Sequence, residues 1–254
     1  MTAPLDPSEI LARKGGERLA MLTAYDYPSA VAVDRCGLDL ILVGDSLAEV
    51  ELGHSSTREV GLAEMAHHVR AVRNGVSRTH VVADMPAGSY GDPVQAVASA
   101  TALVEAGGDS VKLEGGLIPQ VEAILAAGIP VMGHVGLLPQ TAISYRKQGT
   151  SPDTAAQILS EARRLDAAGV YAIVIEAVPD ELAAEITQAV GAPTIGIAAG
   201  SGTDGQVQVI TDLLGLLPDA PGHAQRRADL FSETLRAVAE YAEDVRRTPV
   251  APPQ

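Results

Sequence analysis

Residues 109–136, DSVKLEGGLIPQVEAILAAGIPVMGHVG, contain two short apolar runs that are separated by one helical pattern. The first run leads into Lys112 and Glu114, and the second carries His134. Apolar runs of this length between helical patterns indicate parallel strands that are buried on both faces. Charged groups at the C-terminal ends of such strands are typical of the mouth of an α/β barrel, where these folds keep their chemistry.

The same pattern extends in both directions from this unit. Asp45 and Ser46 follow the run LILVG, Asp84 ends HVVAD, and Glu176 ends AIVIE. The alternation favours a (β/α)8 TIM barrel and leaves a doubly wound open sheet as the alternative. We expect strands at 19–25, 39–45, 79–86, 109–115, 129–136, 170–179, 192–200 and, most weakly, 205–210, and helices at 28–36, 62–73, 93–105, 117–127, 153–168, 180–190 and about 224–247.

The chain length agrees with one barrel. It has 254 residues, and an α/β barrel typically needs about 250. No linker rich in Gly, Ser or Pro divides the sequence. We therefore expect a single domain over residues 1–254, with a frayed N-terminus and a Pro-rich C-terminal tail from about residue 248.

Composition limits the partners and the compartment. A net charge of −14 argues against nucleic acid, because phosphate binding needs a basic surface. No apolar stretch is long enough for a membrane span. The lone Cys36, for which we expect a buried structural role, cannot form an internal disulfide. The N-terminus lacks the apolar core of a signal peptide. These features predict a soluble protein located in the reducing cytoplasm.

Three carboxylates at equivalent strand ends indicate a divalent metal site. Magnesium prefers hard oxygen ligands and commonly takes one or two carboxylates, with water and substrate in the other positions. Asp45 and Asp84 are the main candidate ligands, and Glu114 could bind directly or through water. The alternative for each acid is to cap the helix that follows its strand.

The remaining charged groups suggest acid–base chemistry. Lys112 and Glu114 are two residues apart, so in a strand they share a face, and the lysine needs a carboxylate or a bound anion there. Glu176 ends an apolar strand and is the candidate general base, or else a structural partner of Lys112 or His134. His134 is a candidate hydrogen-bond donor to substrate, a proton carrier or an ordinary buried histidine.

The ordered set of motifs resembles the ketopantoate hydroxymethyltransferase family, and the resemblance covers nearly the whole chain. A Q-G pair after the fifth strand also falls in family order. The motifs are MLTAYDYPSA, VGDSL, GHSST, VVADMP, SY, VKLEGG, IPVMGHVGLLPQ, IEAVP, GTDGQV and the closing YAEDVR.

The resemblance implies a (β/α)8 barrel, a homo-oligomer that is commonly a decamer, and a one-carbon transfer in pantothenate biosynthesis. The donor would be 5,10-methylenetetrahydrofolate and the acceptor 3-methyl-2-oxobutanoate, with Mg²⁺ as cofactor. It also assigns roles to residues. Asp45 and Asp84 would bind the metal with Glu114, and Glu176 would be the catalytic base. The oxo acid would contact Asp45, Ser46, Asp84 and Lys112, and we add His134 as a site donor.

Three departures from the family pattern lie where substrate shape would be set. Ala87 stands where relatives usually carry Phe, and Ala198 stands where they carry Gly. The loop after Gln140 is a few residues short and lacks a Gly-Gly-aromatic element. They leave the metal ligands and base intact but keep open a bulkier 2-oxo acid as substrate, and free formaldehyde as donor.

Two other functions remain as alternatives. A lyase of the phosphoenolpyruvate mutase/isocitrate lyase type would share barrel and metal chemistry, but such enzymes typically carry a cysteine-containing K-K-C-G-H-type loop. Here Cys36 is the single cysteine and lies far from the predicted site in sequence. An inactive paralogue kept as a structural subunit would bind metal without turnover, and the intact acids argue against it.

Overall fold

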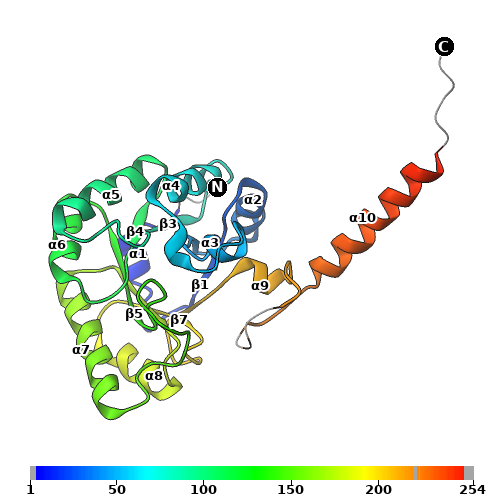
Figure 1. Ribbon diagram of the computed structural model, residues 1–254. Coiled ribbons are helices and arrows are strands. Elements are labelled where there is room, and N and C mark those ends of the chain that lie inside the picture. Colours follow the sequence, from blue (N-terminus) through cyan, green and yellow to red (C-terminus); the bar gives the residue numbers. More distant parts are fainter. Residues whose placement is uncertain (1–3, 220–221, 223, 249–254) are drawn as a thin grey trace. The chain divides into compact units, whose positions relative to one another are not determined.

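Eight parallel strands pair in sequence order and close into a barrel in this computed structural model, which describes residues 4–219, 222 and 224–248 (Figure 1). The predicted TIM barrel is therefore confirmed, and the open sheet is excluded. The strands are β1 Leu19–Thr23, β2 Leu40–Val43, β3 His80–Asp84, β4 Ser110–Lys112, β5 Val131–Gly136, β6 Ala172–Glu176, β7 Thr194–Ile197 and β8 Gly205–Gln208.

Closure depends on the pairing of β8 with β1, which joins the weakest predicted strand to the first one. Leu19 pairs with Gly205 and Met21 pairs with Val207. A Cβ at Gly205 would lie 2.6 Å from the carbonyl oxygen of Leu19, so glycine is required for this close approach. Residues 205–208 show little hydrophobic periodicity because the strand is short and contains two glutamines.

Helices lie on the outside of the barrel (Figure 1). Most predicted helices are confirmed to within one residue at each end, and Asp92 caps α5 by accepting a hydrogen bond from the Gln95 N–H. The sequence missed four short elements, α1, α3, the 3₁₀ turn η1 and the helix Ile210–Leu214, because such short elements carry no periodicity. The helices between residues 7 and 189 are α1 Pro7–Leu11, α2 Tyr27–Cys36, α3 Leu47–Val50, η1 Thr57–Glu59, α4 Leu62–Arg73, α5 Pro93–Glu105, α6 Ile118–Ala126, α7 Pro152–Ala168 and α8 Asp180–Ala189.

The chain forms two compact units, Met1–Gln208 and Val209–Gln254. The second unit contains α9 Ile210–Leu214 and α10 Leu230–Arg247. The final helix begins at 230 and not near 224, because Asp229 accepts a hydrogen bond from the Ser232 N–H and caps it there. The predicted Pro-rich tail falls on residues 249–254, outside the described residues, and the prediction of one domain stays a prediction.

A cluster of apolar side chains fills the interior of the barrel, and α1 contributes to it from below the strands. Ile10 of α1 is fully buried, and the ring of His80 contacts the carbonyl oxygen of Leu5 through Nδ1 at 2.9 Å. Of the N-terminus that was predicted to be frayed, residues 1–3 lie outside the described residues. The cluster consists of Ile10, Leu19, Met21, Leu40, Leu42, Val82, Met132, Tyr171, Ala172, Val174, Ile195 and Val207.

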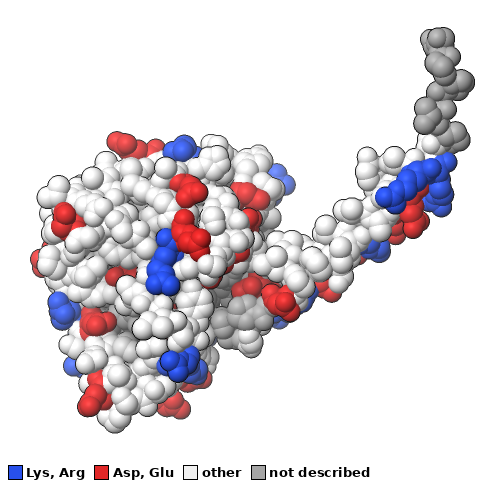
Figure 2. Space-filling view, viewed as in Figure 1, with Lys and Arg blue, Asp and Glu red and all other residues white. Residues whose placement is uncertain are grey.

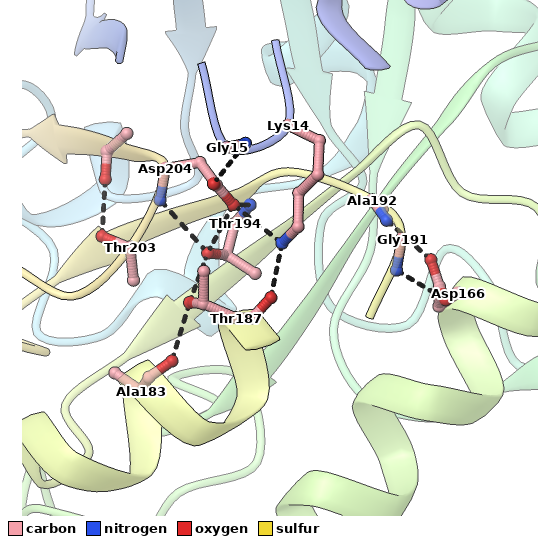
Figure 3. A network of polar contacts seen from close by, with 11 residues as sticks. Lys14, Gly15, Asp166, Ala183, Thr187, Gly191, Ala192, Thr194, Thr203 and Asp204 are labelled. Carbon is pink, nitrogen blue, oxygen red and sulfur yellow. Dashed lines mark hydrogen bonds and ion pairs between the residues drawn. The ribbon is translucent and has the colours of Figure 1, made fainter. Parts of the chain in front are cut away.

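A polar network fastens the chain after α1 to the last two strands (Figure 3). Lys14 Nζ lies 2.9 Å from Asp204 Oδ2 and donates to the Thr187 carbonyl at 2.6 Å. The same carboxylate accepts the N–H groups of Gly15 and Thr194. Burial opposes its charge, but these hydrogen bonds outweigh burial and hold the pKa of Asp204 below its usual range.

Cys36 corrects one expectation. It ends α2 and is exposed, whereas the apolar flanks predicted a buried thiol. The helix ends here because Gly37 adopts a left-handed conformation that exposes its last residues. No helix in the part of the chain that the structure describes has the length and apolar character needed to span a membrane.

Ile10→Ala should destabilise the protein by roughly 2 to 5 kcal/mol, because it leaves a cavity at the base of the barrel. Chemical denaturation followed by circular dichroism measures this difference. Leu11→Ala, a similar truncation at a neighbouring exposed position on the same helix, should cost less than about 1 kcal/mol. Equal effects of the two substitutions would contradict the role given to α1.

Candidate active site

The charged residues predicted from the sequence meet at the C-terminal ends of five adjacent strands. Asp84 is the last residue of β3 and pairs in register with Lys112, the last residue of β4. Glu176 ends β6 and pairs with Gly136 of β5, the strand that carries His134. The remaining members, Asp45, Ser46 and Glu114, follow β2 and β4. All are buried except Ser46, which is half-buried, and Glu176, whose side chain is 21% exposed.

A buried ion pair lies at the centre of this group. Lys112 Nζ is 2.7 Å from Asp84 Oδ1, and both side chains are at least 96% buried. Burial opposes the ammonium charge, but Asp84, Glu114 and Asp45 together raise the pKa of Lys112 well above its usual value. Lys112 therefore stays charged, and it pairs with an aspartate of the neighbouring strand.

Asp45, Asp84, Lys112 and Glu114, here called the carboxylate cluster, bring three acidic groups and one ammonium group together. Burial, together with repulsion from Asp84, raises the pKa of Asp45 to about 7. Burial also raises the pKa of Glu114 to about 9, and Asp45 and Asp84 add to the effect. Three buried carboxylates against one ammonium group make a site that would be stabilised by a further cation.

None of the three acids caps a helix, which removes the structural alternative for them. The following helices begin after Ser46, Asp92 and Leu117 instead. The oxygens of the three acids are the ligand type that Mg²⁺ prefers. Within residues 4–219, 222 and 224–248, however, no three His, Cys, Asp or Glu side chains converge as a complete metal-binding set. The donor set therefore suits a cation that keeps water and substrate among its ligands.

His134 lies between the carboxylate cluster and Glu176. Its Nδ1 is 3.4 Å from Lys112 Nζ, and its Nε2 is 3.3 Å from Glu176 Oε2. An ammonium group has only donors, so Nδ1 acts as acceptor and the ring proton lies on Nε2. Burial and the neighbouring Lys112 lower the pKa of His134, which keeps the ring neutral. Nε2 therefore lies near the Glu176 carboxylate but has no hydrogen-bond partner among the described residues.

Two residues of the site received no role from the sequence, although both lie in the quoted motifs. The Gln140 side chain donates to Asp45 Oδ2 at 2.7 Å and to the Met85 carbonyl at 2.9 Å, and its backbone N–H donates to Glu114 Oε2 at 3.1 Å. The Tyr90 hydroxyl donates to Gln140 Oε1. A glutamine in a long loop gives no periodic signal, so its contact with Asp45 is visible only in the fold.

The backbone around the mouth is unusual at three positions. A Cβ at Gly136 would clash with the carbonyl oxygen of Glu176, so glycine is required where β5 and β6 end. Ala177 and Ala198 adopt left-handed conformations with φ of 47° and 51°. Such residues cost about 1 to 3 kcal/mol each and cluster at functional sites. Ala198 is one of the departures from the family pattern, and its conformation is one that glycine adopts without strain.

The closed parallel barrel, with acidic side chains at the C-terminal ends of its strands, defines this protein as an enzyme of the α/β-barrel class. Phosphonopyruvate hydrolase has a similar fold, with a TM-score of 0.66 and 15% identity over 97% of this chain and 88% of that one. A 2,3-dimethylmalate lyase of the phosphoenolpyruvate mutase/isocitrate lyase superfamily gives a TM-score of 0.63 and 16% identity over 98% and 90%. At this identity the likeness concerns the fold alone.

Sequence comparison identifies the family. The model for ketopantoate hydroxymethyltransferase matches residues 7–250. The 3-methyl-2-oxobutanoate hydroxymethyltransferase of Oleidesulfovibrio alaskensis is 48% identical, covering 97% of this chain and 88% of the relative. The enzyme of the same name from Ignicoccus hospitalis is also 48% identical, over 92% and 91%. The chain belongs to the ketopantoate hydroxymethyltransferase family, as its motifs indicated.

Gln140→Met removes the hydrogen bonds to Asp45 and Met85 at nearly constant volume. We expect Mg²⁺ to bind about 10- to 100-fold more weakly, because such supporting contacts orient the ligand carboxylate. Calorimetric titration of the purified protein with Mg²⁺ gives the dissociation constants. Gln188→Met, the same change on the exposed side of α8, should leave the constant unaltered. Unchanged affinity in Gln140→Met would show that Gln140 has no part in orienting Asp45.

The raised pKa values of Asp45 and Glu114 make stability depend on pH. The folded protein holds these protons up to about pH 7 and about pH 9, whereas unfolded carboxylates release them near pH 4. The unfolded state binds fewer protons, so the free energy of unfolding should fall as pH rises through this range. Thermal unfolding without Mg²⁺ measures the slope, and Glu114→Gln should flatten it. A slope of opposite sign in the wild type would contradict the pKa directions.

Proposed function

We propose that the protein transfers a hydroxymethyl group from 5,10-methylenetetrahydrofolate to 3-methyl-2-oxobutanoate, giving 2-dehydropantoate and tetrahydrofolate. One observation carries this proposal: Glu176 faces the buried carboxylate cluster across His134 in a chain of the hydroxymethyltransferase family. This arrangement supports the proposal because a partly exposed carboxylate lies close to a buried lysine that can attract an anionic substrate. A cytoplasmic, homo-oligomeric enzyme, decameric by the family resemblance, is part of the same proposal.

Asp45 and Asp84 would hold Mg²⁺, with Glu114 close to it. A bound Mg²⁺ would act as a Lewis acid toward the keto and carboxylate oxygens of the oxo acid. Lys112 is charged and buried, and it would attract the substrate carboxylate while paired with Asp84. Ser46, whose Oγ is 2.8 Å from the Tyr25 hydroxyl, lies next to Asp45 in the chain. It would donate a hydrogen bond to the 2-oxo acid substrate.

Glu176 would remove the proton from C3 of the oxo acid. The neutral His134 ring lies beside this carboxylate, with Nε2 3.3 Å from Oε2, and the partial exposure of Glu176 gives the substrate access from the mouth. Water adds to the methylene carbon of the donor, both of its C–N bonds break, and the carbon is released at the formaldehyde level while tetrahydrofolate leaves. Carbon C3 then forms the bond to this carbon, and the oxygen that came from water takes up a proton to become the hydroxyl group. General-base catalysis of this kind contributes about 10²- to 10⁴-fold to the rate.

A different 2-oxo acid is the second candidate, and Ala87 favours it. Ala87 is half-buried in the loop after β3, two residues beyond Met85, whose carbonyl accepts the Gln140 side chain. An alanine in place of a phenylalanine leaves more room at that point of the mouth. The one-carbon donor is also part of the proposal. It is 5,10-methylenetetrahydrofolate, and free formaldehyde is the alternative donor.

Glu176→Gln should abolish proton removal while leaving Mg²⁺ binding in place. We expect wild-type protein with Mg²⁺ in D₂O to exchange the C3 proton of 3-methyl-2-oxobutanoate, and the variant to do so at least about 100-fold more slowly. NMR follows the exchange without any folate. Full turnover is followed by mass spectrometry of the hydroxymethylated product. Glu181→Gln, the same change at an exposed residue of α8, serves as the control.

A panel of 2-oxo acids completes this test. Preference for 3-methyl-2-oxobutanoate supports the proposed reaction, and turnover of a bulkier acid alone would replace it with the second candidate. Mg²⁺ binding with neither exchange nor turnover on any acid would identify an inactive paralogue.

A further inference from the structure

A pocket of about 650 Å³ lies in the loop that follows β5. Its lining comes from residues 136–150, and the proposed reaction gives it no role. Two hydrogen bonds fasten this loop to the end of β6. The Leu137 N–H donates to the Glu176 carbonyl, and the Gln148 N–H donates to the Ala177 carbonyl, both at 2.8 Å. The pocket therefore adjoins the strand end that carries the proposed base.

The same loop contacts the carboxylate cluster from its other side. Gln140 reaches Asp45 and Glu114, while Leu138 and Thr141 on either side of it line the pocket. A ligand that fills this pocket would therefore have one end close to the reacting centre and the other in solvent.

The pocket differs in charge from the rest of the chain. The sequence contains 32 acidic residues, yet none occurs between Glu122 and Asp153. Arg146 and Lys147 both line the pocket. Figure 2 shows acidic and basic side chains interspersed over the face that it presents. A local basic pair of this kind attracts an anion that the net charge of −14 repels.

Both cations are available to a ligand. The Arg146 Nε donates to the Ser144 hydroxyl at 2.9 Å, and in the described part of the chain no carboxylate lies within 4.0 Å of its guanidinium. Lys147 is 55% exposed and lies 3.8 Å from Asp180 Oδ1, a loose pair in solvent. A guanidinium without a carboxylate partner can bind an incoming carboxylate with two parallel hydrogen bonds.

We propose that this pocket binds the p-aminobenzoyl-glutamate part of the folate donor, with Arg146 and Lys147 recognising the glutamate carboxylates. The inference rests on the proposed function and names the donor subsite. Ile143, which is fully exposed and lines the pocket, would lose water by packing against the aromatic ring. Additional glutamates on the donor extend the negative charge towards Lys147, so a polyglutamate tail binds more tightly.

The test compares donors that carry one and three glutamates. For the wild type, we expect a lower KM for the triglutamate form of 5,10-methylenetetrahydrofolate. The double variant Arg146→Gln/Lys147→Gln should raise that KM by about tenfold or more and remove the preference, because two charge-assisted contacts are lost. Arg163→Gln/Arg164→Gln removes the same charge from the exposed side of α7 and should keep the preference.

Calorimetry separates this inference from the proposed reaction. Binding of p-aminobenzoyl-triglutamate is measured directly and needs no turnover. Binding by the wild type that is lost in Arg146→Gln/Lys147→Gln supports the pocket even if no hydroxymethyl transfer is found. Equal binding by the two proteins, no binding by the wild type, or equal loss in the α7 control would overturn it.

Discussion

The ion pair between Lys112 and Asp84 is the interaction on which the rest of the site depends. It is buried between two neighbouring strands, with 2.7 Å between Nζ and Oδ1. Removing either partner would leave an uncompensated buried charge, which costs several kcal/mol, on the order of 3 to 5. The pair also limits the repulsion between Asp45, Asp84 and Glu114. The remaining repulsion and burial keep the pKa values of Asp45 and Glu114 raised.

The loop after β5 links this site to the surface. Gln140 holds Asp45 and Glu114 in place, and backbone hydrogen bonds from Leu137 and Gln148 attach the loop to the end of β6. A shift of the loop would therefore change the surroundings of Asp45, Glu114 and Glu176 together. Proteins of this fold place variable loops at the C-terminal ends of the strands, and binding specificity changes there without disturbing the barrel.

Strand order and the main acids could be predicted because each depends on local pattern. Asp84, Lys112 and Glu176 end apolar runs, and parallel strands bring their C-terminal ends to one side. The short helices, the exposure of Cys36 and the start of α10 could not be predicted, since they depend on single caps and turns. Gln140 and Tyr90 lay within recognised motifs, but their roles follow from contacts across 50 or more residues.

The sequence by itself determined the barrel class, the family and which charged residues gather at the mouth, because periodicity and ordered motifs are properties of neighbouring residues. Only the tertiary structure decided how those charges are paired. It pairs Lys112 with Asp84, brings His134 Nε2 to 3.3 Å from Glu176 Oε2, and raises the pKa values of Asp45 and Glu114 through burial. Desolvation and short-range electrostatics depend on distances between strands, and these exist only in the closed barrel.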